Sequence, residues 1–257
     1  MKILRSSRET REYRKKISGS LGFVPTMGAL HQGHISLVNK SLNETDCTTV
    51  SIYVNPTQFN NENDLENYPT ALDNDLELLE SSGVSAVFVP SYDLLYPDDF
   101  AYEISEKQLS LELCGTNRPG HFTGVLTVVM KLLNLVKPEK AFFGEKDFQQ
   151  LTLIKGMAEA FFLDTEIVGC PIIREADGLA MSSRNLNLST RDRVNSVLFN
   201  RLLKDFTLSD AATIKELGYA GFEVDYVITK ENRRFGAVVM GVAPNEVRLI
   251  DNVEISG

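Results

Sequence analysis

The chain has 257 residues, 43% of them hydrophobic, which is enough apolar material for one large α/β core or two smaller ones. The formal net charge is −9 at pH 7, and this acidic balance argues against a basic surface for nucleic acid. No apolar run is long enough to cross a membrane, and the N-terminal residues lack the apolar region of a signal peptide. The cysteines Cys47, Cys114 and Cys170 form no C-x-x-C pair, so we expect small buried residues in a protein of the reducing cytoplasm.

A charged segment over residues 5–16 has the pattern of a surface helix. The most informative stretch follows, Leu21-Gly-Phe-Val-Pro-Thr-Met-Gly-Ala-Leu-His-Gln-Gly-His34, which predicts a strand, a glycine-bearing turn and then a helix with regular apolar spacing. This construction is typical of phosphate sites, because unpaired backbone N–H groups and the helix dipole point at the anion. His31 and His34 flank Gly33, which would let a nucleotide approach the backbone. Both imidazoles can then donate hydrogen bonds to charge that develops during phosphoryl or nucleotidyl transfer.

Two other interpretations of the histidine pair are possible. The histidines could occur in this loop by chance, although they are two of only three in the chain. A zinc site ranks lower, because no further Cys, His or carboxylate ligand follows at the tight spacing that such a site uses.

Two more strands follow in chain order. Residues 48–54 form a β-rich run that predicts a strand, and Asn55-Pro-Thr-Gln-Phe59 follows it. Asn55 and Gln58 therefore lie at the carboxyl end of a strand, where open α/β sheets bind ligands. An ordinary turn is an equally good interpretation of this segment. The polar stretch 60–67 is expected to be a mobile loop, and Pro69 opens a helix with a leucine stripe. Residues 84–89 form the third strand, and this β–α alternation predicts a parallel sheet with right-handed crossovers.

The middle of the chain repeats the strand-to-helix pattern. An edge strand at 101–104 is possible, and Arg118-Pro-Gly-His-Phe122 precedes an apolar helix over 125–136; for Arg118 and His121 a structural role is slightly favoured over ligand binding. A strand at 140–143 then runs through Gly144 into a helix that extends to Phe162. Lys146 near this junction can neutralise phosphate, whereas Asp147 could equally cap the helix.

A further strand over 165–170 precedes a loop with Ser182, Ser183 and Arg184. Their two hydroxyls and guanidinium could bind phosphate, but this triplet alone is a weak signal for a phosphate site. The pattern then changes to a charged helix over 190–205 and short strands over 222–229 and 236–242, and the segment closes with Glu246-Val-Arg-Leu-Ile250. We therefore predict an α/β fold, with a Rossmann-like parallel-sheet domain over residues 1–185 and a smaller C-terminal α+β domain over residues 186–257.

Seven segments together resemble the pantothenate synthetase (pantoate–β-alanine ligase) family and occur in that family's order. The H-x-G-H segment alone is shared with other nucleotidyltransferases and class I aminoacyl-tRNA synthetases, whereas NPxQF, RPGHF and FGEKDxQQ narrow the resemblance to this family. The segments are Val24-Pro-Thr-Met-Gly28, His31-Gln-Gly-His34, Tyr53-Val-Asn-Pro-Thr-Gln-Phe59, Arg118-Pro-Gly-His-Phe122, Phe143-Gly-Glu-Lys-Asp-Phe-Gln-Gln150, Asp177-Gly-Leu-Ala-Met-Ser-Ser-Arg-Asn185 and Leu249-Ile-Asp-Asn252.

The resemblance implies a two-step ligation, in which ATP and (R)-pantoate form an enzyme-bound pantoyl adenylate that β-alanine then attacks to give pantothenate and AMP. It implies ATP with Mg²⁺, a cytoplasmic homodimer, an ATP- and pantoate-binding domain over 1–185 and a lid domain over 186–257. It assigns His34 as proton donor and no protein ligand to the metal. The implied catalytic residues are His31, His34, Lys146 and Arg184; ATP would also contact Met27, Gly28, Gly144, Glu145, Asp147, Ile173, Met181, Ser182 and Ser183; pantoate and β-alanine would contact Gln58 and Gln150.

The chain departs from the family pattern at Thr70, where arginine is frequent, and at Cys114, where some members carry glutamate; its C-terminal portion also looks shorter than is common. An acyl adenylate hydrolyses readily, so the polar loop 60–67 is a candidate cover for it. The alternative enzyme is another adenylyl- or cytidylyltransferase, for which we would expect a basic pocket in place of Gln58 and Gln150. The alternative of a different class is a non-catalytic nucleotide-binding module.

Overall fold

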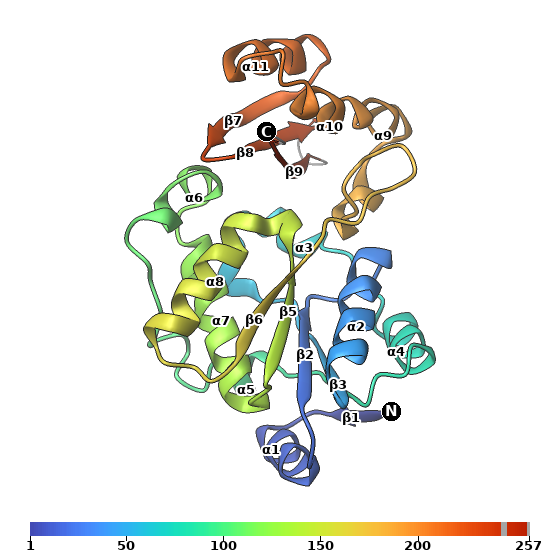
Figure 1. Cartoon of the computed structure of the whole chain (residues 1–257), viewed down its shortest axis with the longest axis vertical. Helices are drawn as coiled ribbons and strands as arrows, with labels where there is room; N and C mark the ends of the chain where they lie inside the picture. Colours follow the sequence, from blue (N-terminus) through green and yellow to red (C-terminus); the bar gives the residue numbers. More distant parts are fainter. Residues whose placement is uncertain (243–245, 256–257) are drawn as a thin grey trace. The chain divides into compact units, whose positions relative to one another are not determined.

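The structure, a computed structural model, describes residues 1–242 and 246–255. The chain divides into two compact units, drawn in Figure 1. Unit 1 comprises residues 1–145 and 149–171, and unit 2 comprises the short segment Lys146–Phe148 together with the chain from Ile172 onward. The second unit thus begins before the predicted boundary at 186, because hydrogen bonds tie the loop after residue 171 to the C-terminal strand, as described below.

Unit 1 is built on a six-stranded parallel sheet with the strand order β1-β4-β3-β2-β5-β6. Such an order follows from strand–helix–strand crossovers, and helices flank the strands on both sides (Figure 1). The strands are β1 (Lys2–Leu4), β2 (Leu21–Thr26), β3 (Cys47–Ile52), β4 (Ala86–Phe88), β5 (Lys140–Gly144) and β6 (Glu166–Cys170). The α-helices are α1 (Ser7–Lys16), α2 (Gln32–Glu44), α3 (Glu62–Glu66), α4 (Leu72–Ser81), α5 (Tyr92–Leu95), α6 (Cys114–Asn117), α7 (His121–Val136) and α8 (Phe148–Ala160, whose first residue lies in unit 2).

The core of unit 1 explains why the central strands read as continuous apolar runs. Val24, Val50 and Val87 come from three neighbouring strands and pack with Leu37 of α2 and Leu79 of α4 in one buried cluster. A parallel sheet is covered on both faces, so both sets of alternating strand side chains are apolar.

Several local predictions were wrong. The short edge strand β1 was missed, residues 101–104 contain no strand, and the stretch 60–67, expected to be a loop, contains α3. Asn61 starts α3 by accepting a hydrogen bond from the Asn63 backbone N–H, which is the usual role of Asn at a helix N-terminus. Cys47 is only partly buried, whereas Cys114 and Cys170 are buried as expected.

Unit 2 contains a three-stranded antiparallel sheet, within the residues that the structure describes. Its order is β7-β8-β9, with β7 (Glu223–Lys230), β8 (Arg233–Met240) and β9 (Val247–Glu254). Ser196 interrupts the predicted helix over 190–205, which forms α9 (Thr190–Asn195) and α10 (Val197–Lys204), and α11 (Asp210–Tyr219) was not predicted. Short 3₁₀ turns complete the two units: η1 (Pro56–Gln58), η2 (Leu109–Leu111), η3 (Glu145–Asp147) and η4 (Ser183–Asn187).

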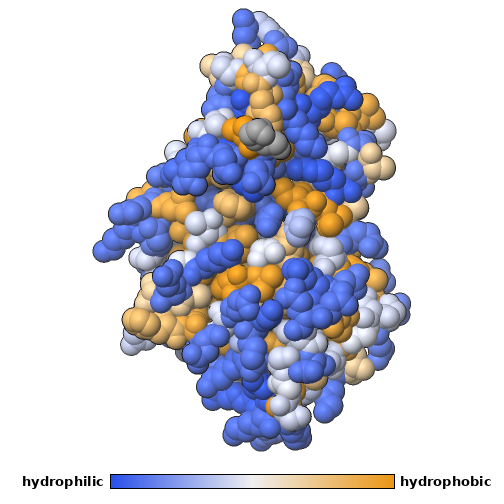
Figure 2. All heavy atoms as spheres, in the orientation of Figure 1, coloured by the Kyte–Doolittle hydropathy of each residue, from blue (hydrophilic) through white to orange (hydrophobic). Residues whose placement is uncertain are grey.

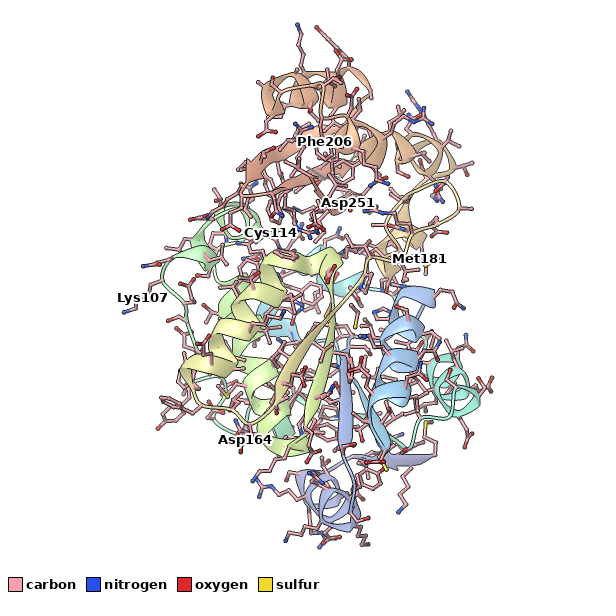
Figure 3. The ribbon with its side chains drawn as sticks, in the orientation of Figure 1. Lys107, Cys114, Asp164, Met181, Phe206 and Asp251 are labelled. Carbon is pink, nitrogen blue, oxygen red and sulfur yellow. The ribbon has the colours of Figure 1, made fainter. Side chains whose placement is uncertain are left out.

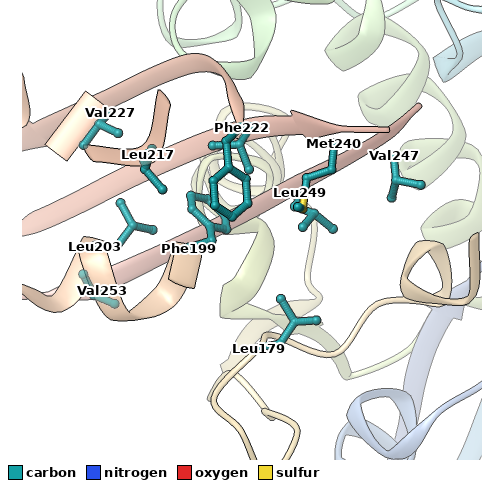
Figure 4. Close-up of a cluster of buried hydrophobic side chains, with 11 residues drawn as sticks. Leu179, Phe199, Leu203, Leu217, Phe222, Val227, Met240, Val247, Leu249 and Val253 are labelled. Carbon is teal, nitrogen blue, oxygen red and sulfur yellow. The ribbon is translucent and has the colours of Figure 1, made fainter. Parts of the chain in front are cut away.

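Helices α10 and α11 and the sheet share the apolar core of unit 2, drawn in Figure 4. Gly236 of β8 allows α10 to pack closely, because a Cβ there would lie 2.8 Å from Leu203 Cδ2. The buried members of this core are Leu179, Phe199, Leu203, Leu217, Phe222, Val227, Val238, Met240, Val247, Leu249 and Val253.

The face of the molecule drawn in Figure 2 is largely polar. Hydrophilic residues cover much of the face drawn in Figure 2, with smaller apolar areas between them. Among residues 1–242 and 246–255, every helix is too short or too polar to cross a membrane.

Candidate active site

The two histidines of the H-x-G-H segment build the N-terminus of α2. His31 is the N-cap residue, and its Nδ1 accepts a hydrogen bond from the backbone N–H of Gly33 at 3.1 Å. His34 Nδ1 accepts in return from the backbone N–H of His31 at 3.3 Å, so the pair forms a reciprocal capping box. The two ring centroids lie 4.1 Å apart, which confirms that both imidazoles lie on one side of the helix terminus.

This arrangement determines where the histidines can carry their protons. A ring nitrogen that accepts a hydrogen bond has no proton of its own, so each neutral ring carries its hydrogen on Nε2. Each imidazole therefore presents an N–H donor on the side of the ring opposite its capping bond. Two such donors at a helix N-terminus suit an anionic group that gains charge.

Asp75 of α4 shapes the loop that leads into the histidines. Its carboxylate is 3% exposed and accepts from the backbone N–H groups of Ala29 and Leu30, both at 2.8 Å. Burial raises the pKa of Asp75 above its usual value, and these two hydrogen bonds oppose the rise. Gly28 and Ala29 both have positive φ, at 85° and 48°, so the carboxylate holds the loop in a conformation that most residues avoid.

Gln58 lies beside this loop with its amide fixed in orientation. Asn55, which is 1% exposed, donates from Nδ2 to Gln58 Oε1 at 3.1 Å and accepts on Oδ1 from the hydroxyl of Tyr96 at 2.8 Å. Burial raises the pKa of Tyr96, so its phenol stays a neutral donor. Since Gln58 Oε1 accepts from Asn55, the Gln58 NH₂ group is the end that faces the sulfur of Met27, at 3.2 Å.

The backbone of Gln58 is anchored by the RPGHF segment. Its carbonyl accepts from Arg118 Nη2 at 3.1 Å and from His121 Nδ1 at 2.8 Å. Arg118 and His121 therefore have the structural role that the sequence slightly favoured. Gly124 of α7 lets the helix lie against this turn, because a Cβ there would come within 2.3 Å of the Thr57 carbonyl oxygen.

Gln149 and Gln150 are adjacent in α8 but differ in their contacts. Gln149 is 7% exposed; it accepts from the backbone N–H of Cys114 and donates to the carbonyls of Leu109 and Glu112. Gln150 is half-buried, and its side-chain amide makes no hydrogen bond with another described residue. Its amide therefore keeps its hydrogen-bonding capacity for a ligand.

Lys146 follows β5 in the chain and belongs to unit 2. Its side chain is 20% exposed, and its Nζ lies 3.6 Å from the carboxylate of Asp147. The Lys146 carbonyl accepts from Asn252 Nδ2 of β9 at 3.0 Å. Gly144 is the last residue of β5 and Glu145 opens the 3₁₀ turn that continues into α8, so the predicted strand-to-helix junction is confirmed.

The Ser-Ser-Arg triplet also belongs to unit 2 and follows a hairpin-like loop. Arg174 pairs with Ala180 in an antiparallel bridge, and the Met181 N–H donates to the Ile173 carbonyl at 3.0 Å. Ser182 then caps η4 by accepting from the Arg184 N–H at 3.3 Å. Met181, at the end of this loop, is labelled in Figure 3.

The structure thus groups the candidate residues into two sets. In unit 1, Met27 and Gln58 are in contact and the paired histidines follow Met27 directly in the loop; Gly28 forms the turn between them. In unit 2, Lys146 and the Ser182–Arg184 segment are both held by the C-terminal sheet.

Sequence reasoning gave no role to Asp75. A signal was present, because Asp75 lies three residues after Leu72 and four before Leu79, on the apolar face of its helix. A carboxylate on a buried helix face needs hydrogen-bond donors, which here are the loop N–H groups.

Comparison with known proteins gives a consistent picture. The family model described as pantoate-beta-alanine ligase matches residues 2–254. A pantothenate synthetase of Bdellovibrio bacteriovorus is 52% identical over 254 residues, which cover 98% of this chain and 99% of that protein. One from Legionella pneumophila is 46% identical with the same coverage.

Solved structures agree with the sequence matches. The crystal structure of a Francisella tularensis pantoate-beta-alanine ligase, complexed with beta-gamma ATP and beta-alanine, has a TM-score of 0.94 and 40% identity, with 100% of this chain and 99% of that chain covered. A Thermus thermophilus pantothenate synthetase has a TM-score of 0.88 and 35% identity over all of both chains. These relatives are matched over nearly their full length, so the C-terminal portion is not short in comparison with them. The chain belongs to the pantoate–β-alanine ligase family, a family of enzymes.

Proposed function

We propose that this chain condenses (R)-pantoate with β-alanine, using ATP and releasing AMP and pyrophosphate through an enzyme-bound pantoyl adenylate. The observation that carries the proposal is the orientation of Gln58, whose NH₂ group faces Met27 in the loop that leads to the paired histidines. A neutral amide suits the hydroxyl groups of pantoate. A nucleotidyltransferase that takes a phosphorylated acceptor would require a cation at this position.

The first step is nucleophilic attack. A pantoate carboxylate oxygen forms a bond to the α-phosphorus of ATP, and the bond from that phosphorus to pyrophosphate breaks, with the electron pair leaving on pyrophosphate. We assign the Nε2–H groups of His31 and His34 to the ATP phosphates. Lys146, Ser182, Ser183 and Arg184 stabilise the departing pyrophosphate, because charge accumulates on its oxygens in the transition state.

The second step forms the amide. The amine of β-alanine attacks the acyl carbon of the adenylate, the amine loses a proton, and AMP leaves with the carboxylate oxygen that pantoate supplied. The chain contributes mainly position and charge, since the pantoate carboxylate is already a nucleophile and the β-alanine amine attacks once it is unprotonated. Gln58 and Gln150 hold the pantoyl group, and α3 with its flanking residues 60–67 is our candidate cover for the adenylate.

We propose that Mg²⁺ enters with ATP on the β- and γ-phosphate oxygens, where it neutralises their charge. Within residues 1–242 and 246–255, no three His, Cys, Asp or Glu side chains lie together as metal ligands. We assign no step of the reaction to the ion.

We also propose that the chain acts as a homodimer in the cytoplasm. All three cysteines are free, which suits a reducing compartment. Light scattering of the purified protein tests the dimer, because a monomeric mass at assay concentration would refute it.

The test of the reaction is release of AMP and pyrophosphate from ATP, with pantoate and β-alanine added singly and together. We expect AMP only when both are present, and a strong loss of it in Lys146→Ala and His34→Glu. Glutamate keeps an acceptor at the third helical position for the capping box, so His34→Glu removes the imidazole without removing the cap. Lys155→Ala, an exposed lysine of α8, is the matched control. AMP formation independent of pantoate would refute the proposal.

A further inference from the structure

Two adjacent residues of unit 2, Asp251 and Asn252, contact neither substrate in the proposed reaction. They are 3% and 2% exposed and lie on β9. Consecutive strand residues point to opposite faces of a sheet, so two polar side chains in succession place one on each face. Their hydrogen bonds lead to two different segments of unit 2, and both segments carry proposed phosphate-binding residues.

Asn252 holds the Lys146 turn. Its Nδ2 donates to the Lys146 carbonyl at 3.0 Å, and its Oδ1 accepts from Arg233 Nη1 at 2.5 Å. The guanidinium of Arg233 lies 4.2 Å from the ring centroid of Phe148, and the Phe235 ring lies 6.0 Å from the same ring. One face of the sheet thus clamps the segment Lys146–Phe148 by a hydrogen bond and by aromatic contacts.

Asp251 holds the loop that ends in the Ser-Ser-Arg triplet. Its two carboxylate oxygens accept from Arg174 Nη1 and Nη2, at 2.7 and 2.9 Å, and Asn200 of α10 donates to the same carboxylate at 2.7 Å. Arg174 Nη1 also donates to the Gly178 carbonyl at 3.1 Å, which closes the hairpin-like loop from within. Asp251 is labelled in Figure 3.

The strand that carries both residues also packs against η4, which contains Ser183 and Arg184. The Asp251 carboxylate is deeply buried, so the loss of its hydrogen bonds to Arg174 would leave a buried charge without partners. These charged hydrogen bonds therefore restrain the position of the loop strongly. We infer that Asp251 and Asn252 are positioning residues, which set the Lys146 turn and the Ser182–Arg184 segment relative to one another on a common strand. This inference rests on the proposed function only in assigning both segments to ATP.

The test is a double-mutant cycle between Asn252→Asp and Lys146→Ala, with kcat and KM for ATP measured separately. Aspartate keeps the shape and the acceptor for Arg233 but cannot donate to the Lys146 carbonyl. We expect kcat/KM for ATP to fall roughly fivefold to tenfold in Asn252→Asp, and by much less when Lys146 is already alanine. A merely structural role predicts the same fold-loss in both backgrounds, and that result would overturn the inference.

The Ser182–Arg184 segment is tested by a second double-mutant cycle, between Arg174→Lys and Arg184→Ala. Lysine keeps the charge beside Asp251 but loses the two-pronged contact and the bond to the Gly178 carbonyl. The control is Asp225→Asn, which removes the charge that faces Arg248 in the same sheet, 2.6 Å between the partners, and leaves Arg174, Lys146 and Asn252 unchanged. We expect this control to leave kcat/KM for ATP within about twofold of the parent.

A binding measurement separates failure of the inference from failure of the proposed function. The same variants are titrated with a non-hydrolysable ATP analogue by calorimetry, without pantoate or β-alanine. If the parent binds the analogue but makes no pantothenate, the proposed function fails, and non-additive losses of affinity still support the inference. Additive losses of affinity would overturn it, whether or not the ligase reaction is found.

Discussion

The replacement Asp75→Asn tests how the loop before the histidines is held. Asp75 joins α4 to this loop by two hydrogen bonds of 2.8 Å, to the N–H groups of Ala29 and Leu30. Asparagine has the same shape but only one acceptor oxygen. Its NH₂ group would face one of the two backbone N–H groups, so one donor loses its partner and meets a second donor.

The size of the effect follows from two opposing contributions. A hydrogen bond to a charged acceptor contributes about 1.5–3 kcal/mol, and one of the two is lost. Removal of a buried charge returns part of this, since burial raises the pKa of Asp75 and its ionised form is already disfavoured. We expect a net loss of about 1–2 kcal/mol in the free energy of unfolding. Activity should fall more steeply than stability, because the loop carries Met27 and leads directly into His31.

The assay is urea unfolding followed by circular dichroism, together with kcat/KM for ATP. The matched control is Asp73→Asn, which removes the same charge from the same first turn of α4 but from an exposed position. Both replacements remove a carboxylate from the first turn of α4, so the additional loss in Asp75→Asn reports mainly on the loop contacts. Equal losses of stability in the two variants, or an unchanged kcat/KM in Asp75→Asn, would refute the reasoning.

Three further predictions concern packing, pH and thiol reactivity. Gly124→Ala should destabilise unit 1 by about 1–3 kcal/mol and raise KM for pantoate, because the new Cβ would press on the turn that contains Gln58. The control is Gly156→Ala, whose Cβ meets nothing within 4 Å and which should be neutral or stabilising. Equal changes in stability for the two variants would contradict this prediction. The hydrogen bond from Lys131 lowers the pKa of Asp98 to about 2, below the value near 3.9 in the unfolded chain. The ionised Asp98 carboxylate therefore stabilises the fold above about pH 4, and this stabilisation is lost as the pH falls towards 2. Acid-unfolding curves should therefore be shallower in Asp98→Asn, and unchanged curves would contradict the assignment. Burial raises the pKa of Cys170 to about 11, so mass spectrometry should find it unmodified by iodoacetamide at pH 8 until urea is added.

Much of the fold was predictable because strand and helix periodicity are local. The parallel sheet, the long α2, α7 and α8, and the change of pattern after β6 all follow from apolar spacing and from Gly and Pro positions. The misses lie where local pattern is weak. β1 has three residues and depends on pairing with β4, and α3 depends on one Asn cap within a polar stretch.

The candidate site was predictable only in part. The paired histidines, Gln58 and Lys146 carry chemical side chains at informative places in the chain. The contacts that hold them come from residues far away in sequence: Asp75 for the loop, Asn252 for the Lys146 carbonyl, and Arg118 with His121 for the Gln58 backbone. No spacing rule connects such pairs, because they meet only once the sheet and its helices are folded.

The most direct measurement follows the oxygen that pantoate supplies. Pantoate labelled with ¹⁸O in both carboxylate positions is turned over with ATP and β-alanine, and the products are analysed by mass spectrometry. An acyl adenylate places one labelled oxygen in AMP and leaves the other in the amide of pantothenate. Label found in pyrophosphate or phosphate, with none in AMP, would contradict attack at the α-phosphorus and with it the proposed ligase reaction.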